Sequence, residues 1–274
     1  MRVAMRRAAH QLFDNPRVLE DPVALLIIGP ETAAKLRDEQ HGLRGRVARH
    51  IRAFMAVRSR YAEDQLALAV GRGVKQYVVL GAGLDTFAYR NPYAESTLRV
   101  FEVDYPATQE WKRRRLAAAR IPIPPSVTYA PVDFEHQTLP EALREAGFDA
   151  ARPTFFSWLG VIMYLSEEAA MSTLGFVAST PLGGGVVFDY AVPRSSLSFW
   201  GRLALDAISR RVAAGGEPFR TFFDPATLLN RLQQIGFHDV EDLNAEQINA
   251  RYFSNRADGL RVGASLGRLM SARV

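Results

Sequence analysis

The spacing of hydrophobic residues divides the chain into a helical first part and a longer part in which strands and helices alternate. Residues 16–72 contain no strand-like run, and the pattern predicts helices there, the longest from about Leu43 to Gly71. At about 100° per residue, one face of this helix carries an apolar stripe. The stripe consists of Val47, Ile51, Phe54, Tyr61 and Ala62. Arg58 falls in the middle of the stripe, and Arg60 falls on the opposite face.

From Lys75 onward, short β-rich runs are separated by helical segments, a pattern typical of a mainly parallel sheet with helices on both faces. Strands are predicted at 76–80, 98–103, 127–131, 154–159, 185–191, 239–243 and 260–264. Helices are predicted at 86–88, 105–119, 139–146, 166–179 and 225–235. The pattern favours a doubly wound, Rossmann-like α/β fold with seven strands.

The alternation suggests boundaries as well as a fold class. Residues 1–72 are expected to form a helical N-terminal cap, and residues 73–274 a ligand-binding domain. Residues 193–222 interrupt the alternation with a helix-like pattern after the fifth strand. Inserted segments above the carboxyl edge of such a sheet commonly cover the ligand, so we expect a helical lid at 193–222.

Composition excludes several chemistries. The 274 residues include no cysteine, which rules out a thiolate nucleophile, a disulfide framework and cysteine-bound metals, and the five histidines are too scattered to predict a metal site. The longest apolar runs, such as Val23–Ile28, are far shorter than the roughly 18 to 20 residues that span a bilayer. Residues 1–16 lack the apolar segment of a signal peptide, so we expect a cytoplasmic protein without membrane contact.

Charge is concentrated at the N-terminus. The whole chain has 34 Lys and Arg against 29 Asp and Glu, and residues 1–60 alone have 12 against 6. This excess permits a nucleic-acid contact, but it equally fits a solvated helical cap. Arg58 differs from the other cations because a guanidinium on an apolar stripe requires a partner. That partner is either a structural carboxylate or the carboxylate of a ligand.

The clearest ligand signal is a glycine turn that follows the first strand directly. Gly81-Ala82-Gly83 comes after an apolar run, and glycine allows a sharp turn and close approach to a ligand. Thr86 occupies the position of the third glycine of the dinucleotide fingerprint. Its presence weighs against NAD and is compatible with a ligand that has no pyrophosphate.

Acidic residues follow at the ends of the next two strands. Glu102 and Asp104 lie 19 and 21 residues after Gly83, where a carboxylate can accept both hydroxyls of a ribose. Because they are two residues apart, both should face the same side of the strand, and either could bind the ribose. Pro106 marks the end of the strand and favours Asp104. The third strand leads to Asp133 and Phe134, which suit the amino group and the ring of an adenine.

The fourth strand and its turn, residues 155–165, are apolar and contain no acid or base. They predict core and a pocket wall, with Trp158 and Tyr164 as candidate substrate contacts. His136 is the one histidine near a predicted carboxyl edge, and its polar neighbours indicate an exposed loop rather than a catalytic base. No catalytic residue is assigned.

Four segments together resemble the leucine carboxyl methyltransferase family of S-adenosylmethionine-dependent methyltransferases. They are Arg58-Ser-Arg-Tyr-Ala-Glu-Asp64, Leu80-Gly-Ala-Gly-Leu-Asp-Thr86, Phe101-Glu-Val-Asp-Tyr-Pro106 and Tyr252-Phe-Ser-Asn-Arg-Ala-Asp-Gly-Leu-Arg261. The resemblance implies the class I methyltransferase fold and S-adenosyl-L-methionine as cofactor.

By the same resemblance, Arg58 holds the methionine carboxylate, Gly81, Ala82 and Gly83 form the cofactor turn, and Asp104 binds the ribose. Asp133 and Phe134 would contact the adenine. The chain departs from the family at Leu159, where relatives often carry a Glu that contributes to the pocket. This departure argues against simply assuming a protein-phosphatase substrate.

The resemblance predicts direct, in-line O-methylation of a carboxylate or hydroxyl on a small molecule or peptide, with natural-product biosynthesis as one setting. A carboxylate is already ionised and needs no base, which favours it because the sequence offers no persuasive base. Two alternatives stay open. One is an NAD-dependent oxidoreductase, disfavoured by Thr86, and the other is a nucleic-acid or regulatory binding module that uses the basic N-terminal face. The oligomeric state is not predicted.

Overall fold

A computed structural model describes residues 1–38, 45–133, 136–213, 218–263 and 267–274. Its strands are β1 Gln76–Leu80, β2 Arg99–Asp104, β3 Val127–Pro131, β4 Thr154–Trp158, β5 Gly185–Tyr190, β6 His238–Leu243 and β7 Arg268–Arg273. Its α-helices are α1 Arg2–Phe13, α2 Val23–Ile27, α3 Pro30–Asp38, α5 Arg46–Gly71, α6 Pro106–Ala118, α7 Leu139–Glu145, α8 Glu167–Ala178, α9 Phe199–Ala213, α10 Pro225–Gln234 and α11 Ala245–Tyr252. Short 3₁₀ turns are η1 Phe87–Tyr89, η2 Ile162–Tyr164 and η3 Arg194–Ser196.

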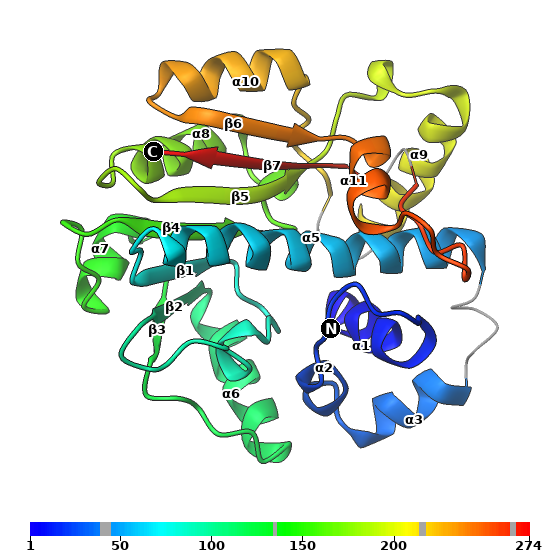
Figure 1. The fold of residues 1–274 in the computed structure, drawn as a ribbon, viewed down its shortest axis with the longest axis horizontal. Helices are drawn as coiled ribbons and strands as arrows, with labels where there is room; N and C mark the ends of the chain where they lie inside the picture. Colours follow the sequence, from blue (N-terminus) through cyan, green and yellow to red (C-terminus); the bar gives the residue numbers. More distant parts are fainter. Residues whose placement is uncertain (39–44, 134–135, 214–217, 264–266) are drawn as a thin grey trace.

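The seven strands form one sheet in the order β3-β2-β1-β4-β5-β7-β6 (Figure 1). Neighbouring strands are parallel from β3 to β5, and β7 runs antiparallel to both β5 and β6. The strand order reverses between β1 and β4, so the crevice outside their carboxyl ends is the expected ligand site of such a sheet. In Figure 1 the arrowheads of β4, β5 and β6 point toward the side on which α1 and α9 lie.

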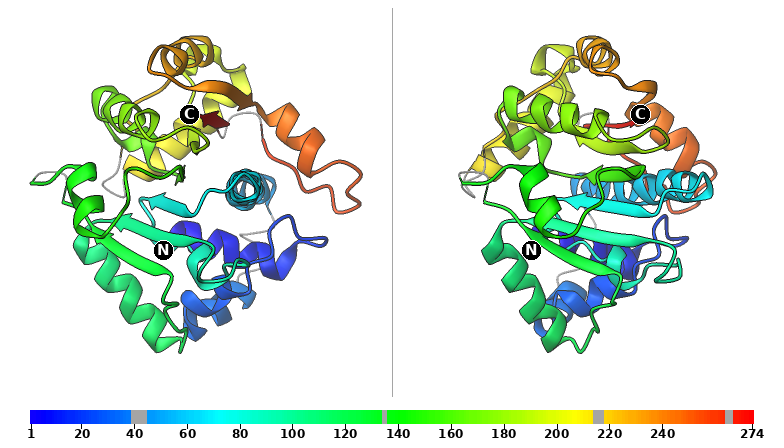
Figure 2. Two further views of the ribbon diagram at one scale, coloured as in Figure 1. Left: turned by 60° about the vertical axis from the view of Figure 1, so that its left-hand side comes forward. Right: turned by 90° about the vertical axis from the view of Figure 1, so that its left-hand side faces the viewer.

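Side chains that alternate along each strand build a core on each face of the sheet. Phe101, Phe156 and Phe188 belong to the core formed with α7, α8 and α10. Tyr77 and Val187 belong to the core formed with α5, η1 and α11. Figure 2 shows α5 on one side of the sheet and the α8 and α10 segments on the other.

The first helices have a core of their own. Small and aliphatic side chains from α1, α2 and α3 pack together with Leu84, next to the glycine turn, and Leu116 of α6. A buried ionic group attaches α1 to α5: Asp14 accepts two hydrogen bonds of 2.7 Å from Arg52 and one of 2.8 Å from His10. The cap is therefore packed against the edge of the sheet that carries the site.

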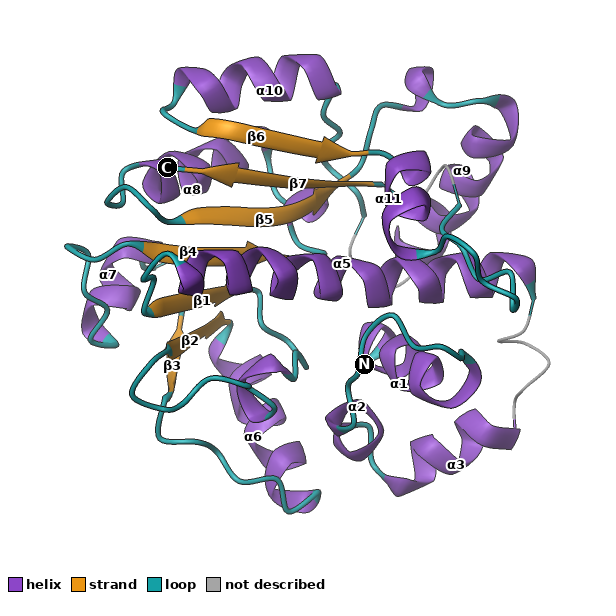
Figure 3. Cartoon of the chain, in the orientation of Figure 1, coloured by secondary structure: helices purple, strands orange, loops and turns teal. Residues whose placement is uncertain are grey.

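The predicted fold is confirmed, and most predicted elements are within two residues of those observed (Figure 3). The prediction of a strand at 260–264 is wrong, since residues 260–263 form a loop and the last strand is β7. Leu260 and Val262 are buried against the α5 side of the core, and this packing produced the strand-like alternation. Helix α11 was not predicted, and α1 was expected only as part of the helical cap, without bounds of its own. Val47 is 60% exposed and so does not belong to the buried stripe.

Candidate functional site

The glycine turn after β1 has a backbone conformation that only glycine adopts readily. Gly81 and Gly83 have φ angles of +65° and +43°. A Cβ atom on Gly81 would overlap Cγ2 of Val161, so the turn lies directly against the segment that follows β4. Ala82 between them is buried, and its amide donates to the Val103 carbonyl at 3.0 Å. The turn is thus fixed between the ends of β2 and β4.

The two candidate acids on β2 have different environments. Glu102 is 1% exposed, lies 2.7 Å from Lys112 Nζ and accepts a hydrogen bond from the Tyr89 hydroxyl. Burial raises the pKa of Glu102, against the opposing effect of Lys112. Asp104 is half-buried at the end of β2, and its Oδ2 accepts from the Gly83 amide at 2.5 Å. Asp104 is therefore the acid that touches the glycine turn.

Arg58 projects from α5 to the carboxyl ends of β4 and β5. Its Nη1 lies 3.0 Å from Oδ2 of Asp189, and both side chains are buried. The other oxygen of Asp189 accepts from the Gly160 amide at 2.5 Å. Gly160 has a φ of +73°, and a Cβ there would lie 2.8 Å from both terminal nitrogens of Arg58. The structural partner that an inward arginine requires is thus Asp189.

Arg58 and the glycine turn are joined through two consecutive residues. The guanidinium lies on Gly160, and Gly81 lies against Val161. The sequence analysis missed Asp189, although the signal was present, since Asp189 is the only charged residue within the otherwise apolar run Gly185–Tyr190.

The N-terminal helices hold the turn from the opposite side. Arg7 is 3% exposed, bonds Oδ2 of Asp85 at 3.0 Å and donates to the Leu84 carbonyl. Burial alone would raise the pKa of Asp85, but nearby cations, led by Arg7, keep it below the usual range. The Thr86 hydroxyl donates to Asp21 at 2.7 Å. Arg58 is therefore not the single inward cation of the N-terminal part, since Arg7 and Arg52 are buried as well.

Comparison with known proteins identifies the family of this chain. The sequence model of leucine carboxyl methyltransferase matches residues 1–178, more than half of the chain. The chain belongs to the leucine carboxyl methyltransferase family. It is an S-adenosyl-L-methionine-dependent methyltransferase, and S-adenosyl-L-methionine is its cofactor.

Relatives agree with this assignment. YktD of Bacillus subtilis, which is named as an S-adenosyl-L-methionine-dependent methyltransferase, is 33% identical over 278 residues that cover 94% of this chain and 91% of that protein. A Mycobacterium avium protein with the same kind of name is 34% identical over 179 residues, covering 61% of this chain and 56% of the relative.

Solved structures share the fold of the methyltransferase. A DUF574 family protein of Streptomyces avermitilis matches with a TM-score of 0.57 and 17% identity, over 98% of this chain and 96% of that one. A Thermobifida fusca protein described as a methyltransferase matches with a TM-score of 0.55 and 17% identity, over 98% and 93% of the two chains. At such low identity the likeness is one of fold alone.

The remaining predicted residues of the methyltransferase lie in different settings. Asp133 is half-buried just after β3, and Phe134 lies outside the described residues. Trp158 is 3% exposed and belongs to the core. Tyr164 is half-buried, and its ring centroid lies 5.5 Å from that of Phe219, which follows α9.

The segment around α9 is attached to the loop after β4. The Arg220 amide donates to the Met163 carbonyl at 2.8 Å, and the Thr221 hydroxyl donates to the Leu165 carbonyl at 2.5 Å. Phe199 and Leu203 on α9 are 66% and 46% exposed. The segment that follows α9 is therefore held against the loop after β4, and α9 itself has exposed apolar side chains.

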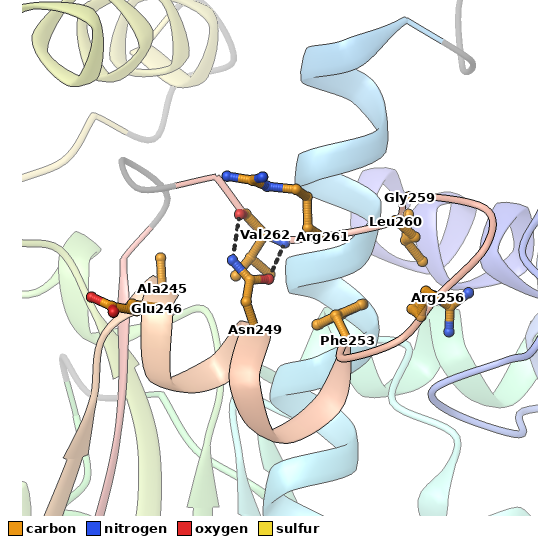
Figure 4. A pocket seen from close by; sticks show the side chains of 9 residues that line it. All are labelled: Ala245, Glu246, Asn249, Phe253, Arg256, Gly259, Leu260, Arg261 and Val262. Carbon is orange, nitrogen blue, oxygen red and sulfur yellow. Dashed lines mark hydrogen bonds between the residues drawn. The ribbon is translucent and has the colours of Figure 1, made fainter.

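A hollow of about 430 Å³ lies between α11 and the loop that follows it (Figure 4). Its lining is Ala245, Glu246, Asn249, Phe253, Arg256, Gly259, Leu260, Arg261 and Val262. None of the glycine-turn residues lines it. Asp104 and Arg58 do not line it either.

Two classes of feature do not occur in the described part of the chain. No described helix is long and apolar enough to cross a membrane. Within the described ranges, no three His, Asp or Glu side chains are grouped so that they could hold a metal ion.

Proposed function

We propose that this methyltransferase methylates an oxygen atom, a carboxylate or a hydroxyl, of a small molecule or peptide by direct in-line transfer. The observation that carries the proposal is the meeting of the Gly81–Gly83 turn, Asp104 and Arg58 at the point where the strand order reverses. Bound S-adenosyl-L-methionine supplies an electrophilic methyl group on a sulfonium. The task of the protein is then to position the acceptor and exclude water.

Each cofactor contact follows from the chemistry of the side chain. Arg58 holds the methionine carboxylate with the guanidinium nitrogens that Asp189 does not engage, since a guanidinium has five donors. Asp104 accepts the ribose hydroxyls because it is half-buried at the edge, whereas Glu102 is fully buried against Lys112. Asp133, with Phe134, borders the adenine from the next strand end. These residue roles are part of the proposal.

The acceptor class follows from the shortage of bases near the turn. Among the described histidines, His10 is bonded to Asp14 within the cap, and His136 is exposed. His238 begins β6, and His50 lies eight residues before Arg58 on α5, a rise of about 12 Å. A carboxylate acceptor is ionised at neutral pH and needs no base, so it suits this setting better than a hydroxyl does.

The stability of the product to alkali tests the acceptor class. The full-length protein is incubated with methyl-labelled S-adenosyl-L-methionine and sets of carboxylic acids, phenols and amines, and the products are treated with alkali. A methyl ester releases labelled methanol, whereas a methyl ether or methylamine retains the label. Release from carboxylic acids is expected. Label retained on nitrogen or carbon would overturn O-methylation, and label retained on oxygen would reassign the acceptor to a hydroxyl.

A further inference from the structure

The segment between α9 and α10 is fixed across the carboxyl ends of two strands. The backbone amides of Arg220 and Thr221 donate to the Met163 carbonyl, in η2 after β4, at 2.8 and 3.3 Å. The Phe223 amide donates at 2.9 Å to the carbonyl of Ala191, the first residue after β5. This segment therefore reaches from the loop after β4 to the end of β5.

Both attachment points adjoin the proposed cofactor site. Val161 lies against the glycine turn, and its carbonyl accepts from the Tyr164 amide of η2 at 2.9 Å. At the other end, Ala191 comes two residues after Asp189, which pairs with Arg58. The segment is thus held within a few residues of the contacts that fix the glycine turn and the Arg58 guanidinium.

Three aromatic rings gather where this segment meets η2. The ring centroids of Tyr164 and Phe219 are 5.5 Å apart with planes at 52°, and those of Phe219 and Phe222 are 6.2 Å apart with planes at 77°. All three residues are half-buried, whereas the neighbouring Phe223 is 4% exposed and belongs to the core. The aromatic cluster, Tyr164, Phe219 and Phe222, therefore keeps part of its surface open beside the proposed site.

The attachment of the segment does not depend on the cluster. The backbone bonds, the bond from the Thr221 hydroxyl to the Leu165 carbonyl at 2.5 Å and the buried Phe223 side chain already hold it in place. Apolar surface left in water is unfavourable, and it gains free energy when a ligand covers it. The open part of the cluster is therefore suited to contact with a bound molecule.

The surroundings of the cluster indicate what kind of group it would bind. Residues 159–165 and 191–193, which follow β4 and β5, contain no charged side chain, and Arg220 is exposed. A group placed here is recognised by apolar contact rather than by an ion pair. Aromatic rings gain more from such contact than aliphatic groups do, because edge-to-face and offset arrangements add to the burial of area.

We propose that Tyr164, Phe219 and Phe222 bind an aromatic ring of the molecule that this enzyme methylates, so that the acceptor is an aromatic carboxylic acid. The inference rests on the proposed function, which supplies the oxygen that receives the methyl group. The cluster assigns the rest of the acceptor. Its ring lies on the side of Val161 away from the glycine turn, and its carboxylate faces that turn.

Thermal unfolding of the full-length protein with saturating S-adenosylhomocysteine tests the site. The probes are phenylacetate and cinnamate, and the references are hexanoate and cyclohexanecarboxylate, which have the same charge and no aromatic ring. We expect the aromatic acids to raise the melting temperature by about 2 to 5 °C and the references to have little effect.

Phe219→Leu and Phe222→Leu should each weaken the binding of the aromatic acids about threefold to tenfold, because each removes a ring contact. The matched control is Phe176→Leu on α8. Phe176 is also half-buried, with its ring centroid 6.2 Å from that of Phe156, and α8 leads to the opposite edge of the sheet, where β5 begins. This control should bind the probes like the wild type, and all three variants should bind S-adenosylhomocysteine unchanged.

Four outcomes would overturn the site. They are equal shifts with aromatic and aliphatic acids, an equal loss of probe binding in Phe176→Leu, unchanged probe binding in both cluster variants, and loss of S-adenosylhomocysteine binding in those variants. Methylation of aliphatic acids on oxygen, with no aromatic acid bound, would refute the inference and leave the proposed function standing. An aromatic amine methylated on nitrogen, and bound more weakly by Phe222→Leu, would refute the proposed function and keep only the ring contact.

Discussion

At the residue scale, the site depends on carboxylates that already have partners within the protein. Asp189 is bonded to both Arg58 and Gly160, and Asp104 is bonded to the Gly83 amide. Such contacts hold a side chain in one orientation before a ligand arrives, which reduces the entropy lost on binding. The proposed cofactor site of this methyltransferase is in that sense preorganised.

The two acids on β2 should separate in a mutational test. Asp104→Ala is expected to weaken S-adenosylhomocysteine binding about tenfold or more, because a carboxylate that bonds hydroxyls is lost. Glu102→Gln is expected to leave that binding nearly unchanged and to lower the free energy of unfolding by about 3 kcal/mol, because buried Lys112 loses its charged partner. Calorimetric titration and urea unfolding measure the two effects. A larger loss of binding in Glu102→Gln than in Asp104→Ala would assign the ribose contact to Glu102 instead.

Asp189→Asn tests whether Asp189 positions Arg58. An asparagine has one acceptor oxygen, so either Arg58 or the Gly160 amide loses its bond. We expect weaker binding of S-adenosylhomocysteine, by about tenfold, in a variant that circular dichroism shows to be folded. Methionine-free adenosine analogues serve as the control and should bind equally to both proteins. An equal loss for these analogues would mean that the variant damages the whole site rather than the carboxylate contact.

At the element scale, the N-terminal helices are held to the rest by buried ion pairs rather than by apolar packing alone. The group of His10, Asp14 and Arg52 joins α1 to α5, and Glu63 with Arg90 joins α5 to the segment after the glycine turn. Breaking a buried pair by removing one partner is costly because the remaining charge is left in a poor solvent. These pairs therefore fix where each helix lies.

Asp14→Asn should lower the free energy of unfolding by about 3 to 5 kcal/mol. Burial alone would raise the pKa of Asp14, but hydrogen bonds from Arg52 and His10 lower it below the ordinary 3.8. Because the folded-state pKa is the lower one, this stabilisation is complete above about pH 4 and is lost as pH falls through that folded value. Urea unfolding from pH 7 to pH 3 should show the gap between variant and wild type shrinking below about pH 4.

The matched control for Asp14 is Glu20→Gln, which removes a carboxylate that pairs with Arg17 on the exposed surface of the same segment. Exposed pairs contribute little, so this variant should unfold almost as the wild type does. A loss in Glu20→Gln equal to that in Asp14→Asn would show that net charge, rather than the buried group, accounts for the effect.

The sequence predicted elements well where a local pattern determined them. Strands at 76–80 and 127–131 were predicted with their observed bounds, since each is a short run between turn residues. The prediction failed where contacts between segments distant in sequence determine the element. Leu260 and Val262 alternate because they pack on the α5 side of the core, and β7 exists because it pairs with β5 and β6. Likewise, the glycine turn was visible locally, whereas the pairing of Arg58 with Asp189 joins residues 131 positions apart.

At the scale of the whole molecule, the arginines of the basic N-terminal part lie in different settings. Arg7 and Arg52 hold the cap in place, and Arg58 lies beside the glycine turn. Arg46 is exposed at the start of α5, and Arg49 donates to the Asp258 carbonyl. A charge excess that the composition alone could assign to nucleic acid is thus divided among structural ion pairs, exposed side chains and the proposed cofactor site.

The contacts between the cap and the glycine turn predict that cofactor binding also stabilises the cap. Arg7 donates to Leu84 and Asp85, and Asp21 accepts from Thr86, so hydrogen bonds join the cap directly to the residues that follow the glycine turn. A ligand that stabilises the turn should therefore suppress local opening of residues 2–38 as well. Amide hydrogen exchange with S-adenosylhomocysteine should slow in α1 and α2 together with residues 76–104, and remain unchanged in α7. In Arg7→Met the protection should persist at the turn and diminish in α1 and α2, whereas protection confined to the turn in the wild type would show that the cap and the site are uncoupled.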